Sequence, residues 1–93
     1  MMDDRNSRLF PLGQIVATPA ALAVTTDEER RTFLHRHQIG SWEETSQEDR
    51  MENMLSLFHG LRILSVHNAS KGKVWIITEA DRSVTTILTP EEY

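Results

Sequence analysis

Hydrophobic and polar positions are most clearly patterned in the last third of the chain. Three apolar runs, residues 61–67, 74–78 and 83–89, are rich in β-branched and aromatic residues, which favour β-strands. The polar segments between them, 68–73 and 79–82, have the Asn, Ser, Gly and Asp content of turns. Because both connections are short, the pattern predicts a three-stranded antiparallel meander.

Short elements are expected nearer the N-terminus. Residues 14–17 are β-branched and predict a small strand or an extended segment. Thr18 and Pro19 then predict the start of a helix that reaches about Val24. Threonine caps free backbone N–H groups, and proline fits the first helical position, where its missing N–H is not needed.

Two longer helices are predicted between this segment and the meander. Thr26 and Glu29 match a capping box, and the helix that they begin should end near Gln38. The other helix should begin at Ser46 and end at Gly60. Its apolar positions fall at helical spacing and form one stripe: Met51, Met54, Leu55 and Phe58. We expect this stripe to pack on one face of the sheet; the alternative is an adaptable binding surface.

These elements predict an α+β fold with a short N-terminal strand, two or three helices and then the antiparallel meander, with the helices on one face of the sheet. In the middle strand of the meander, Val74, Ile76 and Thr78 share one face, while Trp75 and Ile77 share the other. We expect the helices to cover one face. The second face is either open to a partner or another subunit, or partly covered.

Composition limits the cellular setting and the chemistry. The chain of 93 residues predicts one domain over residues 9–93 after a flexible segment 1–8. It contains no cysteine, which excludes disulfides, thiolate zinc sites and cysteine nucleophiles and suits a reducing compartment. It shows neither a signal peptide nor an apolar stretch of about 20 residues that could cross a bilayer. We therefore expect a cytoplasmic protein without a membrane partner.

Charge argues against direct binding of nucleic acid. The net charge is −4, whereas nonspecific binding depends on Lys and Arg that neutralise phosphates. The densest basic group follows the acidic run 27–29 and consists of Arg30, Arg31, His35, Arg36 and His37. On a helix this order complements the macrodipole at both ends. A structural role is therefore favoured over phosphate binding, although a local basic patch stays compatible with the sequence.

The histidines do not have the spacing of a metal site. His35 and His37 are two residues apart, so on a helix their side chains point in different directions. His59 and His67 lie on either side of the first meander strand, and only the fold could bring them together. Specific zinc sites usually have a recognisable ligand spacing. We therefore predict no metal ligand.

The second turn of the meander contains a small group of charged residues, Glu79, Asp81 and Arg82. Paired carboxylates can hold Mg²⁺ or act as acid and base. A solvated turn, in which Asp81 bonds its own backbone, is the favoured interpretation. Because no Gly-rich phosphate loop or hydrolase motif is present, we predict no enzyme, no catalytic residue and no cofactor.

Trp42 lies in the connector between the two longer predicted helices. It either plugs the end of the core or is exposed as an interface anchor, because tryptophan is enriched among interface hot spots. The plug is the favoured interpretation.

Four segments of the sequence are distinctive: Phe10-Pro11-Leu12-Gly13, residues 17–22 (ATPAAL), residues 75–88 (WIITEADRSVTTIL) and residues 90–93 (PEEY). On these segments the chain resembles a family of small bacterial proteins carried on plasmids and other mobile elements, which are labelled plasmid-related or type I restriction subunit M. The resemblance extends from Leu9 onward, with Ala20 where the family pattern has glycine. Methyltransferase activity is not expected, because a Gly-rich cofactor loop and a much larger sheet do not fit into 93 residues.

The resemblance implies a protein of a mobile element that binds and blocks a host defence complex. A negative surface can occupy a groove that was built for nucleic acid. We therefore predict a non-enzymatic protein-binding module that inhibits a host defence complex of the CRISPR or restriction type. Its expected contact residues are Trp42, Glu43, Glu44, Glu48, Asp49, Glu79, Asp81 and Arg82.

The sequence is also compatible with two other functions, and it leaves the oligomeric state open. A DNA-associated accessory or regulatory protein of plasmid maintenance would use Arg30, Arg31, Arg36, Lys71 and Lys73. A minor enzyme would hold a metal at Glu79 and Asp81 or among the histidines. Whether the chain forms a homodimer is not decided by the sequence.

Overall fold

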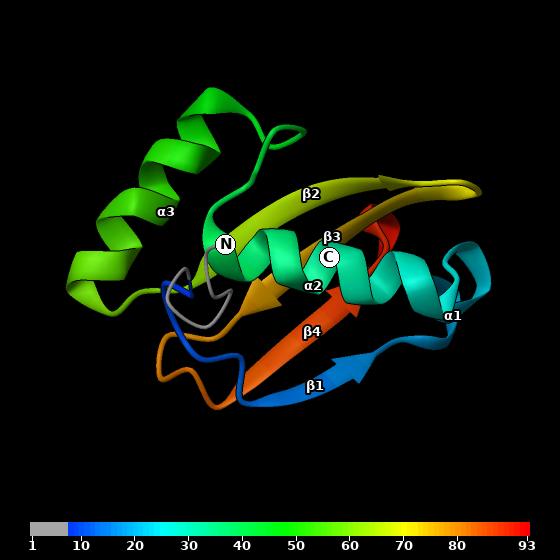
Figure 1. Cartoon of the computed structure of the whole chain (residues 1–93), viewed down its shortest axis with the longest axis horizontal. Helices are drawn as coiled ribbons and strands as arrows, with labels where there is room; N and C mark the ends of the chain where they lie inside the picture. The colour runs from blue at the N-terminus through cyan, green and yellow to red at the C-terminus, as the bar shows by residue number, and fades with distance from the viewer. Residues whose placement is uncertain (1–7) are drawn as a thin grey trace, which may run out of the picture.

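The computed structural model describes residues 8–93 (Figure 1). All of the expected flexible segment except Arg8 lies outside this range. The elements follow in this order: β1 (Gln14–Ala17), α1 (Pro19–Val24), α2 (Asp27–Ile39), α3 (Gln47–His59), β2 (Ile63–Ala69), β3 (Gly72–Thr78), β4 (Val84–Leu88) and the 3₁₀ turn η2 (Pro90–Glu92).

The strands form one mixed sheet in the order β1-β4-β3-β2. β2, β3 and β4 are the predicted antiparallel meander, and Ile76 of β3 lies opposite Ser65 on one side and Ile87 on the other. β1 adds a parallel strand beside β4. The predicted α+β class, with an N-terminal strand, three helices and then the meander, is confirmed.

The helices begin and end where the capping signals predicted. Thr18, Thr26 and Ser46 each accept a hydrogen bond from a backbone N–H in the first turn of α1, α2 and α3, respectively. Gly40 and Gly60 end α2 and α3 in the left-handed conformation, at φ values of 83° and 65°, which glycine adopts without steric cost. Local sequence therefore sets the helix boundaries.

α2 lies across one face of the sheet (Figure 1). The main core cluster beneath it consists of Ala21, Phe33, Val74, Ile76 and Ile87. A second cluster contains Phe10, Trp42 and Ile63, and the indole N–H of Trp42 donates to the carbonyl of His37 over 2.9 Å. Trp42 thus plugs the end of the core, which is the interpretation that the sequence favoured.

The second face of the sheet is partly covered. Ile77 is buried, Trp75 is half-buried, and the ring of Tyr93 packs edge-on against Trp75 with 5.0 Å between the ring centroids. The structure therefore agrees with the interpretation in which the second face is partly covered, and not with the one in which it is open to a partner.

α3 lies at the free edge of β2 and does not cover the sheet (Figure 1). Its apolar stripe is exposed, so the expectation that the stripe packs on the sheet is wrong. Among residues 8–93, no helix has the length and apolar character required to cross a membrane.

Candidate functional site

The outward face of α3 gathers four of the exposed large hydrophobic residues of the described chain. Met51, Met54, Leu55 and Phe58 form it, with exposed fractions between 56% and 85%; the highest value belongs to Phe58. Leu61, just beyond the helix end, is also exposed. A contiguous exposed apolar patch of this kind usually marks an interaction site.

The inward side of α3 is largely polar, and its one apolar contact is Leu57, which packs half-buried against the cluster of Phe10, Trp42 and Ile63. Asn53 and Ser56 are the two buried residues of the helix. The side-chain amide of Asn53 donates to the carbonyl of Leu64 over 2.6 Å, and its oxygen accepts from the Leu64 N–H over 3.0 Å. At about 100° per residue, Asn53 and the apolar face lie on opposite sides of the helix.

The position of α3 explains this polar inner side. β2 is an edge strand, so its outer N–H and C=O groups have no strand partner. Asn53 satisfies both groups of Leu64, and the hydroxyl of Thr45 accepts from the N–H of Val66 over 2.9 Å. The edge requires hydrogen-bonding residues on the inner side of α3, and the apolar residues consequently face solvent.

Arg82 ties the end of α3 to the β3–β4 turn. Its guanidinium donates to the carbonyl of Leu61 over 2.6 Å and to the carbonyl of Ser56 over 3.1 Å. Its own backbone has a φ of 61°, a conformation that costs a non-glycine residue about 1 kcal/mol or more. The structure therefore gives this predicted contact residue a role inside the chain as a clamp.

The other charged residues of this turn behave as the solvated-turn interpretation expected. The Asp81 carboxylate accepts hydrogen bonds from the hydroxyl and the N–H of Ser83, over 2.6 and 3.0 Å, and these bonds lower the pKa of Asp81. The carbonyl of Glu79 accepts from the backbone N–H of Arg82. Asp81 is thus held in place by its own turn.

The remaining acidic candidates fall into two groups. Glu43 and Glu44 both accept hydrogen bonds from Arg36, and bonds from Ser41 and then Arg36 lower the pKa of Glu43 to about 2. Glu48 and Asp49 lie in the first turn of α3. Glu48 lies on the flank of the outward face, whereas Asp49 is one turn before Asn53, on the inner side of the helix, and lines a pocket with Asn53 and Trp75.

Two of the basic residues of the DNA-binding alternative, Arg30 and Arg36, form ion pairs within the chain. Arg36 is paired with Glu43 and Glu44, and Arg30 is paired with Asp27. Lys71 and Lys73 lie at the β2–β3 hairpin, where the N–H of the neighbouring Ser70 donates to the acidic Glu29 over 2.8 Å. The carboxylates of these ion pairs therefore reduce the positive charge that Arg30 and Arg36 would present to a phosphate backbone.

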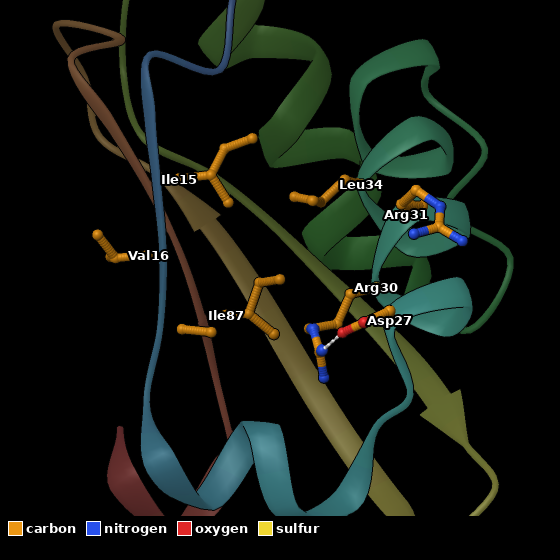
Figure 2. Close-up of a pocket in the computed structure, with 8 residues that line it drawn as sticks. Ile15, Val16, Asp27, Arg30, Arg31, Leu34 and Ile87 are labelled. Atoms are coloured by element: carbon orange, nitrogen blue, oxygen red, sulfur yellow. Dashed lines mark hydrogen bonds and ion pairs between the residues drawn. The ribbon is translucent and has the colours of Figure 1, made fainter.

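A shallow groove of about 260 Å³ runs between β1 and α2 (Figure 2). Ile15, Leu34 and Ile87 line it, and Arg30 and Asp27 are ion-paired at its rim. It is open, and β1 contributes a strand of only four residues. Of the residues that line the groove, Ile15 and Val16 are the exposed large hydrophobics, with exposed fractions of 48% and 38%.

A chain of hydrogen bonds crosses the core beneath α2. It joins the fully buried side chains of His67, Ser65, His37, Thr78 and Thr85, with links of 2.6–2.8 Å, and it ends where Thr85 donates to the carbonyl of Leu12 over 2.7 Å. Because a carbonyl only accepts, this last bond fixes the donors as far as Nε2 of His37, and the remaining directions follow because burial keeps both imidazoles neutral.

The Thr85 proton goes to Leu12, so Thr78 donates to Thr85 and the Nε2–H of His37 donates to Thr78. Nδ1 of His37 must then accept from Ser65, which in turn accepts from Nε2–H of His67. Both imidazoles are neutral in this arrangement, and burial lowers the pKa of His37 to about 3 and that of His67 to about 4. Nδ1 of His67 has no partner within the described residues. All five side chains are fully buried, so the chain of bonds links α2 to the sheet inside the core.

Neither a metal site nor a similarity to known proteins indicates a second candidate functional site. Across residues 8–93, no three His, Cys, Asp or Glu side chains are grouped so that they could hold a metal ion. No protein-family model matches the chain, and neither a curated protein nor a solved structure is significantly similar to it.

Proposed function

We propose that the chain is a non-enzymatic, cytoplasmic protein-binding module whose contact surface is the outward face of α3. The observation that carries this proposal is the exposure of Phe58, which reaches 85% on an ordered helix. A large aromatic side chain held in water is unfavourable, and its burial against a partner would contribute about 1.5–3 kcal/mol.

The spacing of the face fits a known mode of recognition. Met51, Met54, Leu55 and Phe58 stand at positions i, i+3, i+4 and i+7, the set by which an amphipathic helix enters an apolar groove. The two methionines are flexible and polarisable, so they adapt to irregular partner surfaces. We therefore propose a partner that presents an apolar groove to this helix.

The charges beside the face indicate the rim of that groove. Glu48 and Glu52 lie along one flank of the apolar residues, and Arg50 lies along the other. On the side of Glu48 and Glu52, a basic rim on the partner would complement the two carboxylates and exclude acidic competitors. Such a rim is typical of proteins that bind nucleic acid, which supports the proposal that the partner is a CRISPR or restriction complex of the host.

The proposal is tested with three tagged baits in a bacterial lysate that contains CRISPR and restriction systems. They are the wild type, Phe58→Glu and Leu22→Glu, the last being a matched control because Leu22 is an exposed apolar residue on α1. Each captured protein is then purified, and its affinity for the three baits is measured. We expect Phe58→Glu to weaken binding at least about tenfold and Leu22→Glu to leave it unchanged.

Equal binding by Phe58→Glu and the wild type would contradict the proposal. Recovery of DNA alone, with an affinity that falls steeply as salt rises, would instead favour the plasmid-accessory alternative. In that case, Arg31→Glu or Lys73→Glu should weaken binding, and Phe58→Glu should not.

A further inference from the structure

The outward face of α3 has a pattern that reads the same from both ends. Met51, Met54, Leu55 and Phe58 occupy positions 1, 4, 5 and 8 of an eight-residue segment. If two such helices pair antiparallel about a two-fold axis between positions 54 and 55, Met51 faces Phe58 of the other copy and Met54 faces Leu55. Every apolar residue of the face then meets another apolar residue.

The charges along the helix agree with the same pairing. Glu52 and His59 lie seven residues apart, which is two helical turns, so they share one flank of the apolar face. Antiparallel pairing brings Glu52 of one copy beside His59 of the other, twice by symmetry. Histidine can donate a hydrogen bond to a carboxylate in either protonation state.

From this pattern we infer that the outward face of α3 binds a second copy of this chain in an antiparallel, two-fold symmetric helix pair. The two helix macrodipoles are then opposed, which also favours association. The inference rests on the proposed function in that it uses the same face. The dimer covers the apolar residues until a protein partner displaces one copy.

The size of the contact makes this dimer reversible. A helix of 13 residues is about 20 Å long and about 10 Å wide, so it buries less than the roughly 800 Å² per partner of a typical stable complex. Monomer should therefore dominate in dilute solution and dimer in concentrated solution. Sedimentation equilibrium should show an apparent mass that rises from 10.7 kDa towards twice that value.

Because the native chain has no cysteine, single cysteines can report the register of the pair. Under oxidation, Met54→Cys should form a disulfide-linked dimer, because position 54 lies next to the two-fold axis. Met51→Cys alone should not, because its two copies are seven residues, or about 10 Å, apart along the helix. Met51→Cys mixed with Phe58→Cys should cross-link, and Leu22→Cys gives the background from random collisions.

Each other outcome overturns the inference. Equal cross-linking of Met51→Cys and Met54→Cys indicates a parallel or nonspecific contact, and no cross-link above the Leu22→Cys background indicates that the helices do not pair. A constant monomer mass up to about 1 mM protein excludes the dimer as well.

The proposed function is judged separately. Partner capture that is lost in Phe58→Glu, together with a monomeric wild type, leaves the proposed function standing without the dimer. A dimer without any captured partner supports the helix pair and leaves the proposed function without support.

Discussion

α2 and α3 are helices of equal length, 13 residues, with similar ends but opposite orientations of their apolar residues. α2 buries Phe33 and His37 beneath it, whereas α3 buries Asn53 and Ser56 and exposes Phe58. The difference follows from position. α2 covers a sheet face, which presents side chains, while α3 covers a sheet edge, which presents backbone N–H and C=O groups.

The comparison shows that an apolar stripe identifies a helix face without saying where the face points. An edge-covering helix must offer hydrogen-bonding groups inward, because unpaired backbone groups there are costly to bury. Its apolar residues then remain available for another protein.

The same substitution in the two helices should have opposite consequences for stability. Phe33→Ala should lower the free energy of unfolding by about 3–5 kcal/mol, because it opens a cavity beneath α2. Phe58→Ala should change it by no more than about 0.5 kcal/mol, because Phe58 is exposed. Denaturant unfolding of both variants in dilute solution measures the difference. A cost of 2 kcal/mol or more for Phe58→Ala, taken as roughly half of a full cavity effect, would contradict the orientation of α3.

Acid should destabilise the core beneath α2. Burial lowers the pKa values of His37 and His67 to about 3 and about 4, below the ordinary 6.5, so the unfolded chain binds more protons as the pH falls below 6.5. Stability is therefore complete above pH 6.5 and decreases towards pH 4, with a slope that approaches about 2.7 kcal/mol per pH unit when both histidines differ. Denaturant unfolding at a series of pH values measures it.

Two variants test whether this pH dependence comes from the buried histidines. His37→Gln should remove about half of the slope between pH 6 and 5, because one of the two titrating groups is lost. His59→Gln, at the exposed end of α3, is the matched control. A slope in His37→Gln as steep as in the wild type would show that the chain of hydrogen bonds under α2 does not hold His37 neutral.

The polar side of α3 should matter more for stability than its apolar side. Asn53→Ala leaves the N–H and C=O of Leu64 without their partners, which should cost about 2 kcal/mol. Asn53→Leu should not restore the loss, since leucine makes no hydrogen bond. Faster hydrogen exchange at Leu64 in both variants would accompany the effect, and unchanged stability in Asn53→Ala would mean that α3 does not protect the β2 edge.

The sequence predicts the elements of the fold well, because their signals are local. Thr26 with Glu29, and Gly60, mark helix ends through contacts within a few residues. The meander likewise follows from alternation within each strand and short turns between strands. The parallel pairing of β1 with β4 depends on residues about 70 positions apart, such as Gln14 and Val84, and no local pattern encodes it.

The sequence predicts only part of the candidate site. Helical spacing correctly predicts that the apolar residues of α3 form one stripe, but the favoured prediction that this stripe packs on the sheet is wrong. Asn53 and Ser56 were the missed signal, because two small polar residues on the opposite side of a helix suit an exposed strand edge. Likewise, the roles of Trp42 as a plug and Arg82 as a clamp depend on long-range contacts with His37 and Leu61.

The most direct test of the inverted orientation of α3 is the solvent exposure of its methionine methyl groups. The wild type, labelled with ¹³C at the methionine methyl groups, is diluted until sedimentation shows only monomer, and a soluble paramagnetic agent is added. We predict that the signals of Met51 and Met54, assigned with Met→Leu variants, broaden nearly as strongly as those of free methionine. Protection of both methyl groups in the monomer would mean that the stripe packs inside the molecule, and would contradict the account.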